Sequence, residues 1–251
     1  MLDNPVAAPA AETPVGCTIC DGASFNSLGQ ANGYDIFRCA GCGFCFVHPT
    51  PPRYEIEAIY DEYSSNEAYR AKAERKVWRS HKRLKRYRHL APGKRFIDFG
   101  CNIGTAVEAA RRLGFDAYGV DIDRDSVGTA RKIFPGSHFH TGSIESLPDN
   151  WRDFDLGFSV EVIEHIPDPH PYFEALAARL RSGGVLYLTT PDAGHWRVPA
   201  DFTTWREVFP PDHLHFFTRT SMTHFLDRHG FDVIKFVWNL KTGLKLLARK
   251  R

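Results

Sequence analysis

The feature that most constrains the fold is a regular alternation of strand-like and helix-like runs through the C-terminal two thirds of the chain. Short runs rich in β-branched and aromatic residues predict strands, and longer runs with apolar residues at helical spacing predict helices. Such alternation is typical of an α/β, doubly wound fold, in which helices cover both faces of a mostly parallel sheet. The predicted strands are 95–99, 117–120, 138–140, 155–160, 185–190, 231–238 and 243–248, and the predicted helices are 67–89, 105–113, 125–134, 171–181 and 221–229.

The composition fits one full-sized domain with a small addition. The chain has 251 residues, of which 43% are hydrophobic and 25% are charged, as in ordinary soluble proteins. Its formal net charge of +2 does not point to nucleic acid or to a membrane surface, and no apolar run has the length needed to cross a bilayer. Residues 1–16 lack the basic start and apolar centre of a secretory signal. We therefore expect a disordered tail on a cytoplasmic protein.

Four cysteines near the N-terminus have the spacing of a four-thiolate zinc site. Cys17 and Cys20 form one Cys-x-x-Cys pair, and Cys39 and Cys42 form a second. Each such turn aims two thiolates at one point, and two turns complete a tetrahedron. A closed four-thiolate shell leaves no open position, so the expected Zn2+ is structural.

The motifs divide the chain into a tail and three further segments. Residues 17–50 form the expected zinc-ribbon-like module, 51–92 a helical connector with two helices, and 93–251 the α/β domain. Cys45 and His48 remain open as alternative zinc ligands, although a small buried side chain is the favoured interpretation of Cys45.

A glycine-rich turn joins the first predicted strand of the α/β domain to the next helix. Gly100 and Gly104 let the backbone approach a ligand, and the helix N-terminus adds hydrogen-bond donors. The pattern is not Gly-x-Gly-x-x-Gly, which counts against a dinucleotide. Asp98 suits a ligand with a positive group, and Asp121, which ends the second strand, can accept both ribose hydroxyls. Together these positions predict an adenosyl ligand.

These motifs resemble those of the class I S-adenosylmethionine-dependent methyltransferases. The segment 211–218 is similar to the branch that methylates small molecules, and the zinc module is similar to that of bacterial enzymes in this branch, including sugar C-methyltransferases. The resemblance implies S-adenosylmethionine as cofactor and a small-molecule acceptor. Its motifs are Ile97-Asp98-Phe99-Gly100-Cys101 with Gly104, Gly119-Val120-Asp121, Phe154-Asp155, and Val162-Ile163-Glu164-His165-Ile166-Pro167-Asp168-Pro169.

The resemblance also implies a seven-stranded sheet with a reversed last hairpin, and it assigns the cofactor contacts. Asp98 is expected to hold the amino group, Asp121 the ribose, and Glu161 to face the methionine end. The usual acid near Ser143 is missing unless Glu145 replaces it. The remaining implied contacts are Gly100, Asn102 and Gly104 for the methionine part, and Gly142, Ser143 and Ile144 for adenine.

Three histidines are candidate bases for removing the proton of an acceptor hydroxyl, because imidazole titrates near neutral pH. His165 follows the fourth strand, and His213 and His215 lie in the irregular segment after the fifth. His213 is the first choice and His165 the second. The hydroxyl of a sugar or polysaccharide, a phenol or a quinone is the expected acceptor, and a carbon acceptor, as in a sugar C-methyltransferase, remains the alternative. Aromatic residues of the same segment, suited either to covering an acceptor or to core packing, are Trp196, Phe202 and Trp205.

A basic run leaves a second function open. Residues 70–89 contain ten Lys/Arg and one acid, Glu74. A solvated helix face is the favoured interpretation, but a basic patch beside a zinc module is also typical of an RNA methyltransferase. Residues 159–162 read Ser-Val-Glu-Val, unlike the Asn/Asp-Pro-Pro-Tyr loop of DNA-type amino methyltransferases. An inactive scaffold is a further alternative, and the sequence does not predict the oligomeric state.

Overall fold

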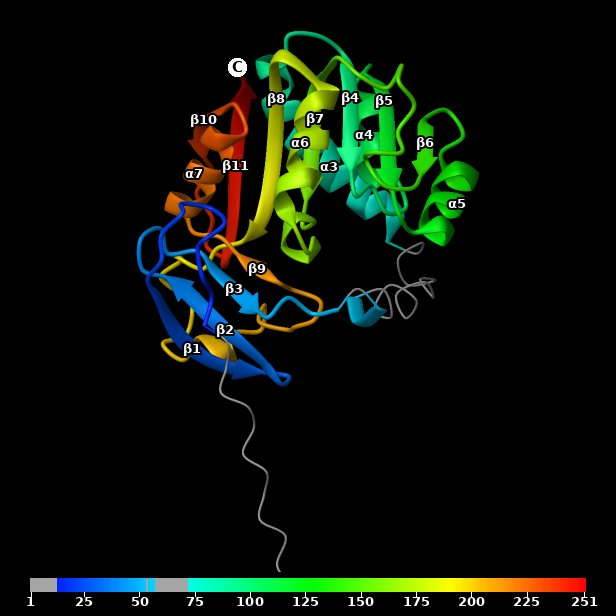
Figure 1. Ribbon diagram of the computed structural model, residues 1–251. Coiled ribbons are helices and arrows are strands. Elements are labelled where there is room, and N and C mark those ends of the chain that lie inside the picture. The colour runs from blue at the N-terminus through cyan, green and yellow to red at the C-terminus, as the bar shows by residue number, and fades with distance from the viewer. Residues whose placement is uncertain (1–12, 53, 57–71) are drawn as a thin grey trace, which may run out of the picture.

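The computed structural model describes residues 13–52, 54–56 and 72–251. Most of the predicted tail, 1–16, lies outside the described residues, and so does most of the first half of the predicted connector, 51–92, apart from a short helical stretch at 54–56. Within the described ranges the strands form two sheets, one of seven strands and one of four (Figure 1). None of the helices in these ranges has the length and apolar character that a bilayer span requires.

The larger sheet confirms the predicted α/β, doubly wound fold. Its strand order is β10-β11-β8-β7-β4-β5-β6. The strands from β8 to β6 pair in parallel, whereas β11 is antiparallel to both of its neighbours. The sheet therefore has the reversed last hairpin that the resemblance implied. Its strands are β4 (Arg95–Phe99), β5 (Asp116–Asp121), β6 (His138–Thr141), β7 (Phe154–Val160), β8 (Leu180–Pro191), β10 (Phe231–Phe236) and β11 (Gly243–Lys250).

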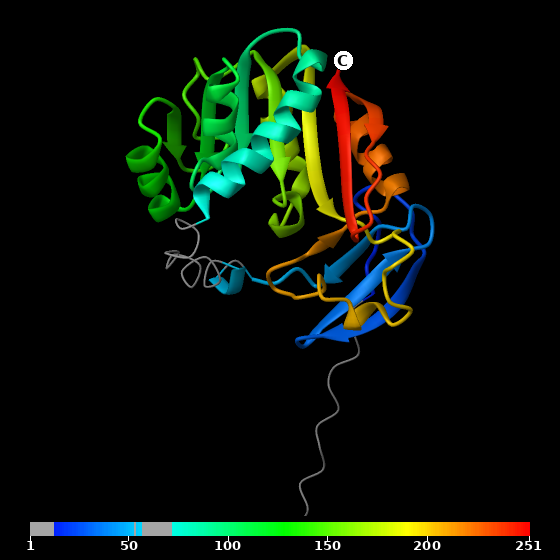
Figure 2. The same cartoon turned by 180° about the vertical axis from the view of Figure 1, so that it is seen from behind.

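Helices cover both faces of this sheet (Figures 1 and 2). One apolar cluster joins α6 and α7 to the sheet, and another joins α3, α4 and α5 to its opposite face. Phe96 and Ile97, which are neighbours in β4, belong to different clusters because successive strand side chains point to opposite faces. The helices are α3 (Ala73–Tyr87), α4 (Thr105–Arg112), α5 (Arg124–Ile133), α6 (Pro169–Arg179) and α7 (Arg219–Arg228).

Several boundaries differ from the prediction by a few residues, two of them for clear local reasons. β8 begins at Leu180 rather than at residue 185, because α6 ends at Arg179 and Leu180 pairs at once with Phe154. α6 begins at Pro169 rather than at residue 171, because Asp168 caps it by accepting a hydrogen bond from the backbone N–H of His170. Both shifts leave the order of elements unchanged.

The smaller sheet combines two segments that lie far apart in the sequence. Its strands β1 (Phe25–Ala31), β2 (Tyr34–Cys39) and β3 (Cys45–His48) come from the N-terminal module, and β9 (His215–Phe216) comes from the segment after β8. Phe202 and Trp205 of that segment pack with Ile36 and Val47 in one buried cluster. The segment predicted as irregular therefore completes the module, which lies at the end of the larger sheet to which β8 points (Figure 1).

Candidate functional site

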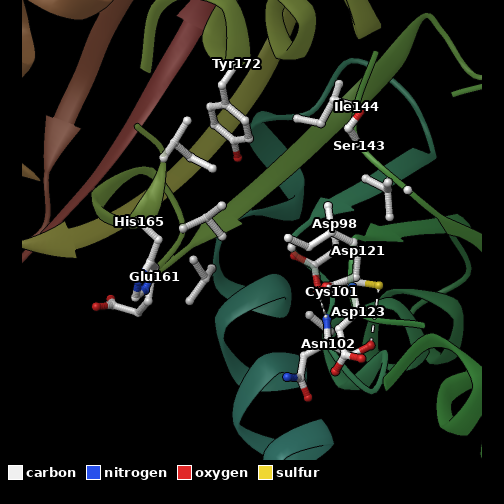
Figure 3. A pocket seen from close by; sticks show the side chains of 18 of the residues that line it. Asp98, Cys101, Asn102, Asp121, Asp123, Ser143, Ile144, Glu161, His165 and Tyr172 are labelled. Carbon is white, nitrogen blue, oxygen red and sulfur yellow. Dashed lines mark hydrogen bonds between the residues drawn. The ribbon is translucent and has the colours of Figure 1, made fainter. Parts of the chain in front are cut away.

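A cavity of about 790 Å³ opens where the parallel strands of the larger sheet end. In doubly wound folds this edge is where ligands bind. Figure 3 shows Glu161 and His165 together on one side of the cavity, and Asn102, Asp121 and Asp123 together on the other. Residues that line the cavity include Lys76, Ser80, Arg83, Asp98, Gly100, Asn102, Asp121, Gly142, Ser143, Ile144, Glu145, Glu161, His165, Tyr172 and His213.

The turn after β4 is held close to β5 and to the segment that follows β7. The backbone N–H groups of Gly100 and Cys101 both donate to the carbonyl of Val120, at 2.9 and 3.0 Å. Gly100 has a φ of +78°, and a Cβ there would lie 2.5 Å from a methyl carbon of Val162. A side chain would be both strained and blocked, so this position keeps the backbone bare at the cavity wall.

Gly104 has a packing role in this structure. It precedes α4 with a φ of +75°, and a Cβ there would lie 2.5 Å from the ring of Phe139. Gly104 is not among the residues that line the cavity, whereas every other predicted cofactor contact is. Its glycine lets α4 approach β6 closely.

Asp121, at the end of β5, holds two backbone segments of the cavity wall by hydrogen bonds. Its Oδ2 accepts the backbone N–H of Asn102 at 2.7 Å, and its Oδ1 accepts the N–H of Asp123 at 2.9 Å. Burial raises the pKa of this carboxyl. Each carboxylate oxygen has a second lone pair, so Asp121 can still accept the two hydroxyls of a ribose.

Asp98 is buried at the floor of the cavity, only 5% exposed. Burial and the charge of Asp121 raise its pKa well above the ordinary value, and the charge of Arg83 acts in the opposite direction. A buried carboxylate beside another carboxylate favours a cationic partner. The site therefore fits a ligand that brings a positive group to this point, as the ammonium of S-adenosylmethionine does.

The basic helix α3 contributes to the cavity, which the sequence analysis did not predict. Lys76, Ser80 and Arg83 line it, and the Arg83 guanidinium lies 5.1 Å from the ring of Tyr187. These three positions are spaced as successive turns on one helix face, beside the buried Val77 and Leu84. This spacing was the sequence signal that could have predicted a shared face. Because these residues line the cavity, part of the basic run faces it.

The predicted adenine side is formed by the turn after β6. The backbone N–H of Gly142 donates to the carbonyl of Asp121 at 2.9 Å, which ties this turn to the end of β5. Ser143, Ile144 and Glu145 follow and line the cavity. Tyr172 of α6 also lines it, with its hydroxyl 3.0 Å from Ser159 Oγ. Its position in a helix far along the chain gave no local signal.

Glu161 and His165 follow β7 on the side of the cavity opposite Asp121 (Figure 3). Glu161 has a φ of +55°, which is rare for a side-chain-bearing residue, and its carboxylate accepts the Thr189 hydroxyl at 2.6 Å. His165 Nδ1 lies 2.9 Å from the carbonyl and 3.0 Å from the carboxylate of Asp212. Burial opposes the charge of His165, but the hydrogen bond that His165 donates to Asp212 and the charge of Glu164 outweigh it and raise the pKa to about 9.

The two other predicted histidines have different surroundings. His213 lines the cavity, its ring 4.7 Å from that of His165, and its Nδ1 lies 2.7 Å from the carbonyl of Glu207. His215 lies in β9, stacked on Phe44, and is not among the lining residues. Burial lowers the pKa of His215 to about 4. The structure therefore brings His165 and His213 together and separates His215 from them.

The aromatic residues of the same segment do not reach the cavity. Phe202 and Trp205 are buried in the cluster that joins β2 and β3 to this segment. Trp196 is exposed, with Arg197 over its ring. The packing interpretation is thus the one that fits Phe202 and Trp205.

The four cysteines of the two Cys-x-x-Cys pairs come together in the module. Cys17 and Cys42 Sγ atoms lie 3.7 Å apart, Cys20 and Cys39 Sγ atoms lie 3.5 Å apart, and all four lie within 4.8 Å of one another. Tetrahedral zinc with Zn–S bonds of about 2.3 Å requires sulfurs about 3.8 Å apart. The arrangement fits zinc. Cys45 is buried apart from this cluster, and Arg38 Nε donates to its sulfur.

Comparison of the sequence with known proteins gives one family and distant relatives. The family model described as "Methyltransferase domain" matches residues 69–235. A ubiquinone biosynthesis O-methyltransferase of Sinorhizobium medicae is 30% identical over 102 residues, covering 39% of this chain and 41% of the relative. One of Cereibacter sphaeroides is 27% identical over 168 residues, covering 59% and 68%. The chain thus spans less than half of the first of these curated relatives.

Solved structures share the fold. The magnesium protoporphyrin IX methyltransferase of Synechocystis, solved with S-adenosylmethionine, is 17% identical with a TM-score of 0.55, covering 78% of this chain and 97% of that one. An S-adenosylmethionine-dependent methyltransferase of Clostridium acetobutylicum is 15% identical with a TM-score of 0.54, covering 78% and 98%. At these identities the likeness concerns the fold alone.

Proposed function

Because the chain belongs to the methyltransferase-domain family, we propose that it moves a methyl group from S-adenosylmethionine to a hydroxyl oxygen of a small molecule. The observation that carries this proposal is the two-sided cavity. Asp98 and Asp121 lie on the side suited to the cofactor. Glu161, which we still assign to the methionine end of the cofactor, lies across the cavity from Asp121 together with His165 (Figure 3), and the His213 ring lies 4.7 Å from that of His165. A phenol, a quinone-type hydroxyl or a sugar hydroxyl fits the second side. The named ubiquinone-pathway relatives favour the first two.

The cofactor side binds and orients. Bound S-adenosylmethionine supplies a methyl carbon activated by an adjacent sulfonium. Asp98 accepts hydrogen bonds from the ammonium, Arg83 pairs with the carboxylate, and the bare backbone at Gly100 allows close approach. Asp121 accepts from the ribose, and the turn at Ser143 and Ile144 covers adenine. His165 lies on the acceptor side of the cavity, opposite Asp121, and Glu164 precedes it in the short helix after β7.

The acceptor side handles the hydroxyl proton. Because a carbonyl oxygen only accepts hydrogen bonds, Nδ1 of His213 carries the hydrogen that reaches Glu207. The Nε2 atom of a neutral His213 then has a lone pair for a proton or for a cation, as a base near the acceptor requires. Alignment of oxygen, methyl carbon and sulfur, with water excluded, supplies the remaining catalysis.

The zinc module supports this domain from outside the cavity. We assign Zn2+ to Cys17, Cys20, Cys39 and Cys42 as a structural ion, because four thiolates leave no open position. Reduced thiolates fit the cytoplasm, which remains the expected compartment.

Calorimetric titration with S-adenosylhomocysteine tests the cofactor assignment, and transfer of isotope-labelled methyl to a panel of phenols, quinols and sugars tests the acceptor. We expect one product molecule bound per chain with a dissociation constant in the micromolar range, and labelled methyl ether from the phenol or quinol members. A folded, zinc-containing protein that binds no S-adenosylhomocysteine would contradict the proposal and favour a scaffold.

A further inference from the structure

We propose that Glu164, His165 and His213 form a binding site for a divalent transition-metal ion at the acceptor side of the cavity. One ligand atom from each of the three lies within 4.8 Å of the others. The inference deepens the proposed methyl transfer and rests on it, because it concerns how the same site binds the acceptor. The site is separate from the four cysteines of the module.

The two imidazoles are oriented as metal ligands usually are. His165 Nδ1 lies against the carbonyl and carboxylate of Asp212, and His213 Nδ1 lies 2.7 Å from the carbonyl of Glu207. Since carbonyl oxygens only accept, each Nδ1 carries a hydrogen and each Nε2 is the ring atom left for an ion. Because the pKa of His165 is raised to about 9, its Nε2 releases a proton to solvent when the ion binds. Metal-binding histidines almost always donate their other N–H to such an oxygen, which fixes the ring.

The carboxylate adds an independent observation. Glu164 is fully buried, at 0% exposure, and its Oε2 accepts the Thr190 hydroxyl at 3.0 Å. Its Oε1 is buried and has no hydrogen-bond partner in the described part of the chain. A buried carboxylate oxygen without a partner is costly, and a cation held between Glu164 and the two imidazoles would remove that cost.

A purely hydrogen-bonded cluster explains this arrangement less well. In the described residues no hydrogen bond joins Glu164 to either imidazole, although one such bond would satisfy Oε1. Two imidazoles and one carboxylate with positions left open suit Zn2+, Co2+, Fe2+ or Mn2+ rather than Mg2+ or Ca2+.

Such an ion gives the acceptor oxygen a defined position. A hydroxyl bound to the ion loses its proton more readily. The proton passes to solvent, and an oxygen electron pair forms the new O–CH3 bond. The S–CH3 bond breaks, and its electron pair stays on sulfur as the sulfonium becomes a thioether. In this arrangement His213 holds the ion instead of taking the proton directly.

Cobalt absorption distinguishes this site from the cysteine site. The zinc-loaded protein is titrated with Co2+ in the presence of S-adenosylhomocysteine. Cobalt held by nitrogen and oxygen gives visible d–d bands, whereas cobalt held by thiolates adds a strong charge-transfer band in the near ultraviolet. We expect d–d bands that saturate at one Co2+ per chain without the charge-transfer band. Saturation only through the charge-transfer band, or no bands at all, would overturn the metal site.

Four variants complete the test. Glu164→Gln keeps an oxygen for Thr190 but loses the charge, and His213→Gln removes a ligand at a less buried position. Each should weaken Co2+ binding at least about tenfold. Asp212→Asn, which alters the group that orients His165 and that also lies 4.0 Å from Nε2 of His213, should weaken it roughly 10–100-fold. His138→Gln, at the exposed start of β6, should bind as the wild type does.

Calorimetry with S-adenosylhomocysteine on the same samples separates the two proposals. Normal binding of this product without Co2+ binding overturns the metal site and leaves the methyl-transfer proposal standing. Loss of both Co2+ binding and S-adenosylhomocysteine binding points to failure of the methyl-transfer proposal. Variants that remain folded by circular dichroism and bind Co2+ as the wild type does also overturn the metal site.

Discussion

Asp121 shows how one carboxylate can order the backbone and still be available to a ligand. Both of its oxygens accept backbone N–H groups, from Asn102 and from Asp123. These bonds fix the turn after β4 against the end of β5. Asp121 also lines the cavity, so the residue that orders the turn is the one to which we assign the ribose.

Asp121→Asn should therefore weaken cofactor binding while leaving a folded protein. An amide keeps one acceptor oxygen but turns an NH2 group toward a backbone N–H. It also removes the charge. Hydrogen bonds to charged groups contribute about 1.5–3 kcal/mol, so we expect S-adenosylhomocysteine to bind roughly 10–100-fold more weakly in calorimetry.

The matched control for this prediction is Asp116→Asn. Asp116 begins the same strand and is exposed at the end away from the cavity. Its variant should bind S-adenosylhomocysteine normally. Equal affinity in Asp121→Asn and the wild type would remove the ribose assignment.

At the scale of elements, helix α3 has two sides with different roles. Lys76, Ser80 and Arg83 line the cavity, while Arg79 and Lys85 are exposed. Since Arg83 is the residue whose charge reaches Asp98, we expect Arg83→Met to weaken S-adenosylhomocysteine binding about tenfold or more through loss of the carboxylate partner.

Arg79→Met is the control on the solvent side of the same helix. It should leave binding of S-adenosylhomocysteine unchanged when both variants are compared by calorimetry at equal ionic strength. Equal losses in the two variants would show that general positive charge, rather than a contact of Arg83, supports the cofactor. That result would support the interpretation of residues 70–89 as a basic patch.

Elements set by local pattern could be predicted from the sequence, and those set by distant pairing could not. The hydrophobic run predicted β4, and the glycine spacing predicted the turn at Gly100. The place of Asp121 at the end of the second predicted strand likewise put it at the site. β9 has two residues and exists because Cys45 and Phe46 pair with it. A contact between such distant segments leaves no local pattern.

The candidate site divides in the same way. The sequence predicted His165 and His213 on the acceptor side, but it placed His215 with them, although β9 carries His215 under Phe44. It treated Glu164 only as part of a motif. Glu164 is buried where two distant segments meet, since the backbone N–H of Leu214 donates to its carbonyl at 2.8 Å.

At the scale of the molecule, the cysteine module is tied to the helices of the larger domain. Arg228 of α7 and His170 of α6 both donate to the carbonyl of Thr18, between the first two cysteines. Thr218 donates to the carbonyl of Cys42 at 3.0 Å. The module also shares its sheet with β9. Loss of the proposed zinc ion should therefore lower the stability of the whole chain.

Cys39→Ser should reduce zinc content and lower the Tm of the protein. Three thiolates hold zinc less firmly, and the sheet strand β2 ends at this residue. For a chain of this size each kcal/mol corresponds to about 2–4 °C, so we expect Tm to fall by roughly 5 °C or more by calorimetry. Binding of S-adenosylhomocysteine below the transition should persist, because Asp98 and Asp121 belong to the larger sheet.

Cys45→Ser is the matched control, since Cys45 is a buried cysteine of the same module that lies outside the four-sulfur cluster. It should retain one zinc per chain by elemental analysis. If Cys39→Ser keeps both its zinc and its Tm while Cys45→Ser loses them, Cys45 is the ligand. If neither variant changes the zinc content or the Tm, the module folds without the ion. The hydrogen bonds to the carbonyls of Thr18 and Cys42 would then be enough to hold the module against the larger domain.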